Sequence, residues 1–325
     1  MRRRAVILLA LAMAITWIPA AAVCEEQTSV GFYFDTVVTV RLYDPDSRLM
    51  EDIMAACGRY ENLLSKTVAG SDVDRINTAG GRPVTVDHET WEILARAKEI
   101  SERSGGAFSV TVAPLTAMWD FTEGTQRMPS DAERLAALPL VDDTAIVLGP
   151  DDTVTLPEHM QIDLGGIAKG YIADRIADLV RGRCAAALLN FGGNVYCVGT
   201  KPNGQRFKVG IRDPQGTPDS VLGAVSVADV SVVTSGVYER FFIKDGVRYH
   251  HILNPATGLP AWTDLAGVTV VDQSSMTADA AATACIVLGS EGALVFLTEL
   301  GLDGLLVTNE GQILATPGFT DKWVQ

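Results

Sequence analysis

The chain has 325 residues, of which 47% are hydrophobic and 20% are charged. This composition allows a sizeable core and excludes global disorder, and the length suits one large domain or two closely packed lobes. The net charge of −14 argues against nucleic acid as a partner, because proteins neutralise phosphates with clustered Lys and Arg side chains.

The first 23 residues have the pattern of an export signal peptide. Three arginines at positions 2–4 precede an apolar run over 5–18, and small residues follow at 20–22. The run is shorter than the about 20 residues that a membrane-spanning helix needs. We therefore predict an exported, extracytoplasmic protein whose folded domain covers 24–325. An N-terminal anchor that stays uncleaved is the alternative.

Cys24 follows Ala21, Ala22 and Val23, an arrangement that resembles a bacterial lipoprotein signal with cysteine as the first mature residue. The residue before that cysteine is usually small, and Val23 departs from this pattern. The sequence therefore leaves two outcomes open, a lipid anchor at Cys24 on the outer face of the cell membrane and simple secretion.

Hydrophobic spacing predicts the elements of the first part of the chain. Alternation with period 2 indicates strands, and apolar stripes with helical spacing indicate helices. The expected elements are a strand over 29–43, helices over 49–64 and 88–104, a hairpin over 145–148 and 154–156, and a strand over 160–164 that turns into a helix over 167–181.

The second part of the chain is richer in strands. The expected elements are strands over 187–191, 194–198, 207–211, 222–227 and 248–253, a strand over 267–271 that enters a helix over 276–288, a helix over 291–300, and closing strands over 304–307 and 312–315. Helices and strands are interspersed, with hairpins in the second half. This order favours an α+β (mixed α/β) fold over a doubly wound parallel sheet.

The stretch 163–170, with sequence Asp-Leu-Gly-Gly-Ile-Ala-Lys-Gly, is the most informative of the chain. Gly165 and Gly166 allow a backbone to approach a ligand closely. The helix expected after them presents free N–H groups and a partial positive charge, which suit a phosphate, and Lys169 adds a cation. A plain strand-to-helix turn with an exposed lysine is the alternative.

A carboxylate and a hydroxyl share one face of the helix expected over 276–288. Asp279 and Thr283 are four residues apart, so both lie on the same side. Their oxygens can serve a hard cation such as Mg²⁺. The alternative is that Asp279 favours the helix dipole and that Thr283 bonds back to its own helix.

Two adjacent histidines end the strand expected over 248–253. Neighbours on a strand point to opposite faces, so one of His250 and His251 is expected to enter a site, where its pKa near neutrality suits a general base. Asn254-Pro255 and then Thr257-Gly258 follow as a rigid turn. A structural histidine is the alternative.

Two further segments have the composition of ligand-binding turns. Thr234, Ser235 and Gly236 precede Tyr238, and a glycine pair, Gly192-Gly193, interrupts two strand-like runs. For each of them alone, an ordinary turn is the alternative.

Together these segments resemble the ApbE family, the FAD:protein FMN transferases, from about Phe34 to Ala315. The order and number of the motifs carry the resemblance. The matching segments are Phe34-Asp35-Thr36, Leu64-Ser65 with 71–77, Gly106-Ala107-Phe108 with Thr111, Pro114 and Trp119, 163–170, Gly192-Gly193-Asn194, Gly210-Ile211 with Asp213-Pro214, Thr234-Ser235-Gly236, 251–258, and Asp279 with Thr283.

The resemblance implies an ApbE-like fold of mixed and antiparallel sheets flanked by helices, and a Mg²⁺-dependent transfer. A threonine hydroxyl of an acceptor protein attacks the FMN-side phosphorus of FAD, and AMP leaves. It further implies acceptors in membrane-associated, flavin-based electron transport. The implied roles are Mg²⁺ binding by Asp279, Thr283 and the Ala168 carbonyl, a base at His251, and flavin-nucleotide contacts at Gly165, Gly166, Lys169, Gly192, Gly193, Thr234, Ser235, Gly236, Tyr238, Thr257 and Gly258.

The chain departs from the family pattern at two positions. Many relatives have Asp where Ser109 stands, and many have a tyrosine, expected to cover the flavin ring, where Thr67 stands. The second departure leaves the balance between transfer and hydrolysis open. The alternatives are therefore a metal-dependent FAD pyrophosphatase that gives FMN and AMP, and a non-catalytic exported flavin-binding protein.

Overall fold

The computed structural model describes residues 24–217 and 219–324. The signal peptide predicted over 1–23 lies outside the described residues. Within them, helices are interspersed with strands that pair in an antiparallel manner, which confirms the predicted α+β class.

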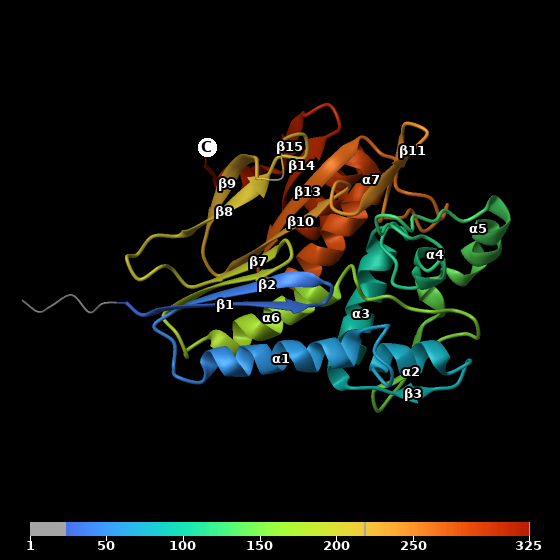
Figure 1. Ribbon diagram of the computed structural model, residues 1–325, viewed down its shortest axis with the longest axis horizontal. Helices are drawn as coiled ribbons and strands as arrows, with labels where there is room; N and C mark the ends of the chain where they lie inside the picture. Colours follow the sequence, from blue (N-terminus) through green and yellow to red (C-terminus); the bar gives the residue numbers. More distant parts are fainter. Residues whose placement is uncertain (1–23, 218, 325) are drawn as a thin grey trace, which may run out of the picture.

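The centre of the molecule is an eight-stranded sheet in which every strand is antiparallel to its neighbours (Figure 1). The strands lie in the order β1-β2-β6-β7-β10-β13-β14-β15, which places β1 and β15 at the edges. Their bounds are β1 (Glu26–Tyr33), β2 (Thr36–Tyr43), β6 (Ala186–Phe191), β7 (Asn194–Val198), β10 (Val230–Gly236), β13 (Leu265–Asp272), β14 (Asp303–Thr308) and β15 (Ile313–Ala315).

The single long strand expected over 29–43 is wrong, because β1 and β2 form a hairpin there. Phe34 and Asp35 make the two-residue turn with φ of 56° and 55°, and Tyr33 pairs with Thr36. Positive φ at both turn residues matches the twist of a hairpin, but the usual Asn-Gly or Asp-Gly pair is absent from this turn. The alternation of residue types continues through the turn and hides it.

Four helices cover one face of the sheet, and a large apolar core lies between the two layers. Their bounds are α1 (Leu49–Leu64), α3 (His88–Arg103), α6 (Ala168–Val180) and α7 (Ser275–Leu300). The helices expected over 49–64, 88–104 and 167–181 are confirmed. The two helices expected over 276–288 and 291–300 are confirmed as the two parts of α7, which are separated by a kink at Gly289, where φ is 74° and ψ is 173°.

Among the described residues, α7 alone is long and apolar enough to cross a membrane. In its first half, residues on all sides are buried within the protein, including the successive Ala280, Ala281 and Ala282. A helix that is apolar all round is also typical of a protein core, and α7 is the core helix of this fold.

The opposite face of the sheet packs against a smaller three-stranded sheet through a second apolar core. The small sheet contains β8 (Phe207–Arg212), β9 (Val221–Val227) and β16 (Trp323–Val324), next to the short α8 (Pro317–Thr320). The strands expected over 207–211 and 222–227 are confirmed.

A second small sheet, β3 (Val84–Thr85), β5 (Thr153–Thr155) and β4 (Val147–Leu148), contains the expected hairpin. The strand expected over 160–164 is wrong, because no strand pairs with this segment. The side chain of Asn77, from α2 (Asp72–Thr78), binds the backbone N–H and C=O of Ile162 at 2.7 and 3.0 Å instead. A side-chain amide thus satisfies the extended backbone.

A separate hairpin, β11 (Phe241–Lys244) and β12 (Val247–His250), packs on a third apolar cluster with α4 (Ala113–Thr116) and α5 (Asp131–Ala137). The strand expected over 248–253 therefore ends at His250, three residues earlier than expected. Leu253 instead pairs with Pro260 in an isolated bridge.

Candidate active site

The glycine turn of 163–170 is held tightly at the start of α6. The Leu164 carbonyl accepts hydrogen bonds from the N–H groups of Ile167 and Ala168 at 3.0 and 2.8 Å. The carboxylate of Asp163 accepts from the Gly165 N–H at 2.9 Å and from Lys66 Nζ at 2.6 Å. The turn therefore has a fixed shape before any ligand arrives.

Gly166 brings this turn against α7. A Cβ on Gly166 would lie 3.2 Å from the Phe108 ring and 3.7 Å from Thr283 Oγ1. The predicted phosphate turn and the predicted metal ligand Thr283 are thus neighbours in space, although more than a hundred positions separate them in the sequence.

Asp279 binds the first turn of α6. Its Oδ2 accepts a hydrogen bond from the Gly170 N–H at 3.0 Å, and the residue is 3% exposed. Ile167, at the N-cap of α6, offers no side-chain cap, so Asp279 satisfies one of the free N–H groups of that turn. The close approach needs Gly170, because a Cβ there would lie 2.3 Å from the Ser275 carbonyl oxygen.

Lys169 completes this cluster with a positive charge. Its Nζ lies 3.7 Å from Asp279 Oδ2 and donates a hydrogen bond to the Gly165 carbonyl at 3.1 Å. The buried carboxylate thus has a cation and a helix N-terminus beside it. The same two positive features can face an anionic ligand.

The oxygens of Asp279 and Thr283 fit a hard cation. Within 24–217 and 219–324, neither Asp279 Oδ1 nor Thr283 Oγ1 has a hydrogen-bond partner. Thr283 therefore does not bond back to its own helix, in contrast to Thr298, whose hydroxyl donates to the Leu294 carbonyl at 2.7 Å. A carboxylate oxygen and a hydroxyl that lack partners match the oxygen ligands that Mg²⁺ prefers.

The described part of the chain contains no group of three or more His, Cys, Asp or Glu side chains that could hold a metal. A metal at this position would depend on one carboxylate, one hydroxyl and backbone carbonyl oxygen, as the predicted set of Asp279, Thr283 and Ala168 has it. Because only one of these three ligands is charged, the remaining coordination positions of the metal can be taken by substrate phosphates.

The two adjacent histidines have different surroundings. His250 is 3% exposed, and its Nδ1 has no hydrogen-bond partner among the described residues. His251 is half-buried just beyond β12, and its Nδ1 lies 3.3 Å from the Arg240 carbonyl. Because a carbonyl only accepts, Nδ1 carries the proton and Nε2 keeps its lone pair.

Burial lowers the pKa of His251 from 6.5 to about 4, with smaller contributions from the Arg240 and Lys169 charges. His251 is therefore neutral at pH 7, with a lone pair on Nε2 that can accept a proton, but it is a weaker base than the pKa near neutrality expected from the sequence.

The end of β10 gathers further predicted residues. The Thr234 N–H donates to the Gly193 carbonyl at 3.2 Å, and the Thr234 hydroxyl lies 2.9 Å from that of Thr269. Tyr238 packs directly over Gly236, where a Cβ would lie 2.4 Å from its ring. Burial raises the pKa of Tyr238 to about 12, so its hydroxyl stays protonated and available as a donor. Ser235 lies between these residues and is half-buried.

Gly192 and Gly193 form the turn between β6 and β7 with φ of 62° and 101°. A Cβ on Gly192 would lie 2.0 Å from Thr36 Oγ1, so only glycine allows this contact between neighbouring hairpins. Gly192 is therefore needed for the packing of these hairpins. The contact of the glycine pair with a ligand stays a prediction.

Thr257 and Gly258 lie against another part of the molecule. Arg134 donates to the Thr257 carbonyl at 2.6 Å, and Trp119 Nε1 donates to the Gly258 carbonyl at 3.2 Å. In the described structure, no hydrogen bond joins these two residues to the glycine turn or to Asp279. Their predicted contact with the nucleotide stays a prediction.

Sequence reasoning missed Asp143, which fixes the segment that packs on the glycine turn. Its carboxylate accepts hydrogen bonds from the N–H groups of Val110 and Thr111 at 3.0 Å and from the hydroxyls of Ser109 and Thr111 at 2.6 Å. The residue is 5% exposed. Many relatives are expected to have an Asp at position 109. In this chain, Ser109 stands there instead and donates a hydrogen bond to the Asp143 carboxylate.

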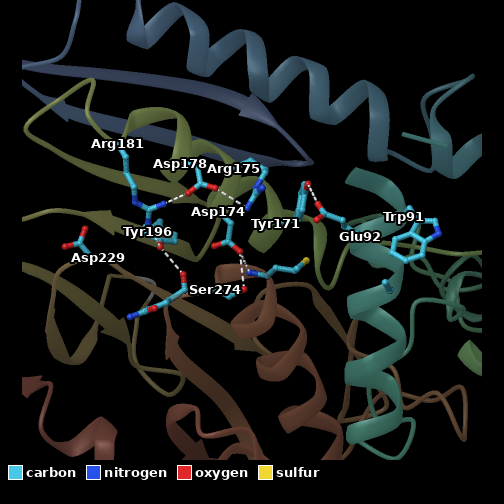
Figure 2. A pocket seen from close by; sticks show the side chains of 13 residues that line it. Trp91, Glu92, Tyr171, Asp174, Arg175, Asp178, Arg181, Tyr196, Asp229 and Ser274 are labelled. Carbon is cyan, nitrogen blue, oxygen red and sulfur yellow. Dashed lines mark hydrogen bonds and ion pairs between the residues drawn. The ribbon is translucent and has the colours of Figure 1, made fainter. Parts of the chain in front are cut away.

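The structure also has a hollow of about 690 Å³ beside the contact of α6 with the N-terminus of α7 (Figure 2). None of the predicted site residues lines it. Its cations are already paired, because Arg175 lies 3.1 Å from Asp178 and Arg181 donates to the Tyr196 hydroxyl at 3.0 Å. The hollow therefore offers less to a phosphate than the cluster around Lys169.

Comparisons with known proteins identify the family of the chain. The model of the ApbE family matches residues 34–306. The chain is 36% identical to the FAD:protein FMN transferase of Treponema pallidum over 92% of this chain and 89% of that protein. A second FAD:protein FMN transferase, from Klebsiella pneumoniae, is also 36% identical, over 86% of this chain and 89% of that protein.

The fold has a close counterpart among solved structures. The crystal structure of the ApbE protein from Thermotoga maritima superposes with a TM-score of 0.85 at 31% sequence identity, over 93% of this chain and 100% of that one. Sequence and fold thus match over nearly the whole described chain, and the chain belongs to the ApbE family.

Proposed function

We propose that this chain transfers the FMN part of FAD to a threonine hydroxyl of an acceptor protein and releases AMP. The observation that carries the proposal is the cluster of Asp279, Lys169 and the first turn of α6 at the glycine turn. It combines a cation, a helix N-terminus and oxygen ligands, which together suit a diphosphate. The names of the relatives from Treponema pallidum and Klebsiella pneumoniae support the same activity.

In the proposed reaction, the threonine oxygen attacks the FMN-side phosphorus of FAD. The new bond joins that oxygen to phosphorus, the bond between this phosphorus and the bridging oxygen breaks, and AMP leaves with the electron pair. His251 Nε2 takes the hydroxyl proton, for which its neutral form is suited. Lys169 is placed to stabilise charge on the phosphate oxygens.

Mg²⁺ held by Asp279, Thr283 and the Ala168 carbonyl would neutralise charge on the phosphate oxygens. The remaining proposed nucleotide contacts come from the glycine turn and from the end of β10. There, the small residues Gly165, Gly166 and Gly236 permit close approach, and the Ser235 and Tyr238 hydroxyls supply hydrogen bonds.

One observation favours hydrolysis as a second candidate. Thr67 is exposed, and its hydroxyl lies 3.0 Å from that of Ser65. A threonine there covers less of a flavin ring than the tyrosine expected from the family. Water could then replace the acceptor hydroxyl and give free FMN.

One incubation separates the candidates. The protein is mixed with FAD, Mg²⁺ and a threonine-containing acceptor domain, and the products are denatured. Flavin fluorescence that stays on the denatured acceptor means transfer, free FMN alone means hydrolysis, and intact FAD means a binding protein without catalysis.

The proposed setting of the reaction is outside the cytoplasm, with acceptors that belong to membrane-associated electron transport. Cys24 lies two residues before β1, so a lipid on its side chain would tether the folded domain close to a membrane surface. Metabolic labelling with a fatty acid, compared between the wild-type chain and Cys24→Ala, tests the anchor.

A further inference from the structure

The β11–β12 hairpin exposes apolar side chains close to the proposed base. On one face of the hairpin, Phe241 and Ile243 are 36% and 64% exposed. On the opposite face, Val247 is 42% exposed, and Trp262, which packs on Tyr249, is 52% exposed. Trp262 Nε1 donates to the Arg248 carbonyl at 3.0 Å, which fixes the indole against β12. Clustered exposed apolar side chains of this kind mark interaction sites more often than scattered ones do.

This exposure is a property of an ordered element. The face that carries Phe242, Tyr249 and Val247 is anchored by aromatic stacking, with ring centroids of Phe242 and Tyr249 5.3 Å apart and those of Phe242 and Phe121 5.8 Å apart. Trp119 stacks on Phe121 at 5.9 Å beneath them. The hairpin is thus held rigidly, which lowers the entropy cost of binding a partner.

The hairpin is also basic in an acidic protein. Arg240, Lys244 and Arg248 are all exposed within this short stretch, against the single acid Asp245. The Arg248 guanidinium lies 4.6 Å from the centre of the Phe241 ring, so a cation sits directly over an apolar side chain. Because the whole chain has a net charge of −14, an acidic partner is repelled elsewhere and attracted here.

The backbone of the hairpin offers a free strand edge. Within the described residues, β11 pairs with β12 alone, and Figure 1 shows the hairpin standing apart from the eight-stranded sheet. An edge strand with unpaired N–H and C=O groups can take an extended segment of another chain.

The hairpin leads directly to the proposed base. The His251 N–H donates to the Arg240 carbonyl at 3.0 Å, so the residue before β11 and the residue after β12 close the base of the hairpin together. A polypeptide that lies along the hairpin therefore reaches the imidazole that is proposed to receive the threonine proton.

From these features we propose that the β11–β12 hairpin with Trp262 is the docking surface for the acceptor protein. The acceptor contributes an extended segment with apolar and acidic side chains next to its threonine. This inference rests on the proposed transferase function and adds how the enzyme recognises its protein substrate.

Charge and polarity changes at two exposed positions test the surface. Ile243→Asp and Lys244→Glu are compared with Ile313→Asp on β15 and Lys208→Glu on β8, which are exposed residues of the same types on strands of other sheets. We expect the first pair to raise the KM for the acceptor by about tenfold or more, with kcat at saturating acceptor and FAD affinity unchanged. The second pair should keep the wild-type KM.

Three results would overturn the proposal, and they differ from one another. If wild-type enzyme transfers FMN while all four variants keep its KM, the surface is wrong and the function stands. If wild-type enzyme transfers nothing, the proposed function fails and the surface with it. If Ile243→Asp instead dissociates a dimer of the enzyme in sedimentation experiments, the hairpin joins two copies of this chain.

Discussion

Asp279 of α7 caps the first turn of α6, and Asp174 of α6 caps the first turn of α7. Asp279 accepts from the Gly170 N–H at 3.0 Å, while Asp174 accepts from the N–H groups of Ser275 and Met276 at 2.7 and 3.0 Å. Figure 2 shows Asp174 pointing toward Ser274 at the start of α7. The two helix N-termini are therefore fixed to each other, and the proposed ligands of the substrate are fixed with them.

This reciprocal capping needs glycine at position 170. We predict that Gly170→Ala lowers the free energy of unfolding by at least about 2 kcal/mol, because its Cβ would collide with the Ser275 carbonyl. Gly58→Ala on α1 is the matched control, since a Cβ there meets nothing within 4 Å, and helix propensity favours alanine. Urea denaturation of the two variants measures the difference. Equal stabilities would contradict the close helix contact.

The carboxylate of Asp279 has two separable roles. Asp279→Asn keeps an oxygen for the Gly170 N–H, so we expect the free energy of unfolding to change by less than about 1 kcal/mol. The loss of its charge should lower the Mg²⁺-dependent transfer rate by at least about a hundredfold. Transfer assays and calorimetric titration of Mg²⁺ test this. An Asp279→Asn protein with the wild-type rate and Mg²⁺ affinity would remove the proposed metal site.

The pH dependence of transfer reports on His251. Burial lowers the pKa of His251 to about 4, so its neutral form persists well below pH 6.5. We predict that the transfer rate falls only as the pH approaches 4, and that His251→Ala loses most of the activity while it still binds FAD. A pH–rate profile with FAD-binding controls provides the measurement. Full activity in His251→Ala would rule out its role as the base.

His250 should make the fold sensitive to acid. Burial lowers its pKa from 6.5 to about 4, so the unfolded chain binds the proton more tightly than the folded one. The stability that the neutral histidine contributes is present above pH 6.5 and is lost as the pH falls toward 4, by on the order of 3 kcal/mol. Denaturation at pH 7 and pH 4.5 should show a smaller difference for His250→Gln than for the wild type. Identical differences would contradict a buried neutral His250.

The long helices of this protein could be predicted closely from the sequence, whereas the short helices α2, α4, α5 and α8 were missed. The expected helix over 49–64 has the bounds of α1, and its apolar stripe, from Ile53 to Leu64, is buried as predicted. Periodicity works for α1 because this helix turns one continuous face to the core. The prediction missed the β1–β2 turn at Phe34 and Asp35 because the turn lacks the usual Asn-Gly or Asp-Gly pair. It wrongly assigned a strand to the extended segment at Ile162, because a side chain, and not a neighbouring strand, pairs with that backbone.

The proposed site could be predicted in part. The spacing of Asp279 and Thr283 placed both on one helix face, and the glycine pair placed a turn before α6. The contact of Asp279 with Gly170 could not be predicted from local pattern, because it joins residues 109 positions apart. Asp143 was also missed because its partners are distant in the sequence. Its four hydrogen bonds join it to residues 109–111, and no local sequence pattern indicates them.

The central claim is that a flavin nucleotide bound at the Asp279 and Lys169 cluster is transferred to an acceptor threonine. The most direct test is mass spectrometry of an acceptor domain after incubation with the protein, FAD and Mg²⁺. We predict that the acceptor gains the mass of one FMN group on a threonine and that AMP appears in equal amount. An acceptor of unchanged mass, with FMN and AMP free in solution, would contradict the claim.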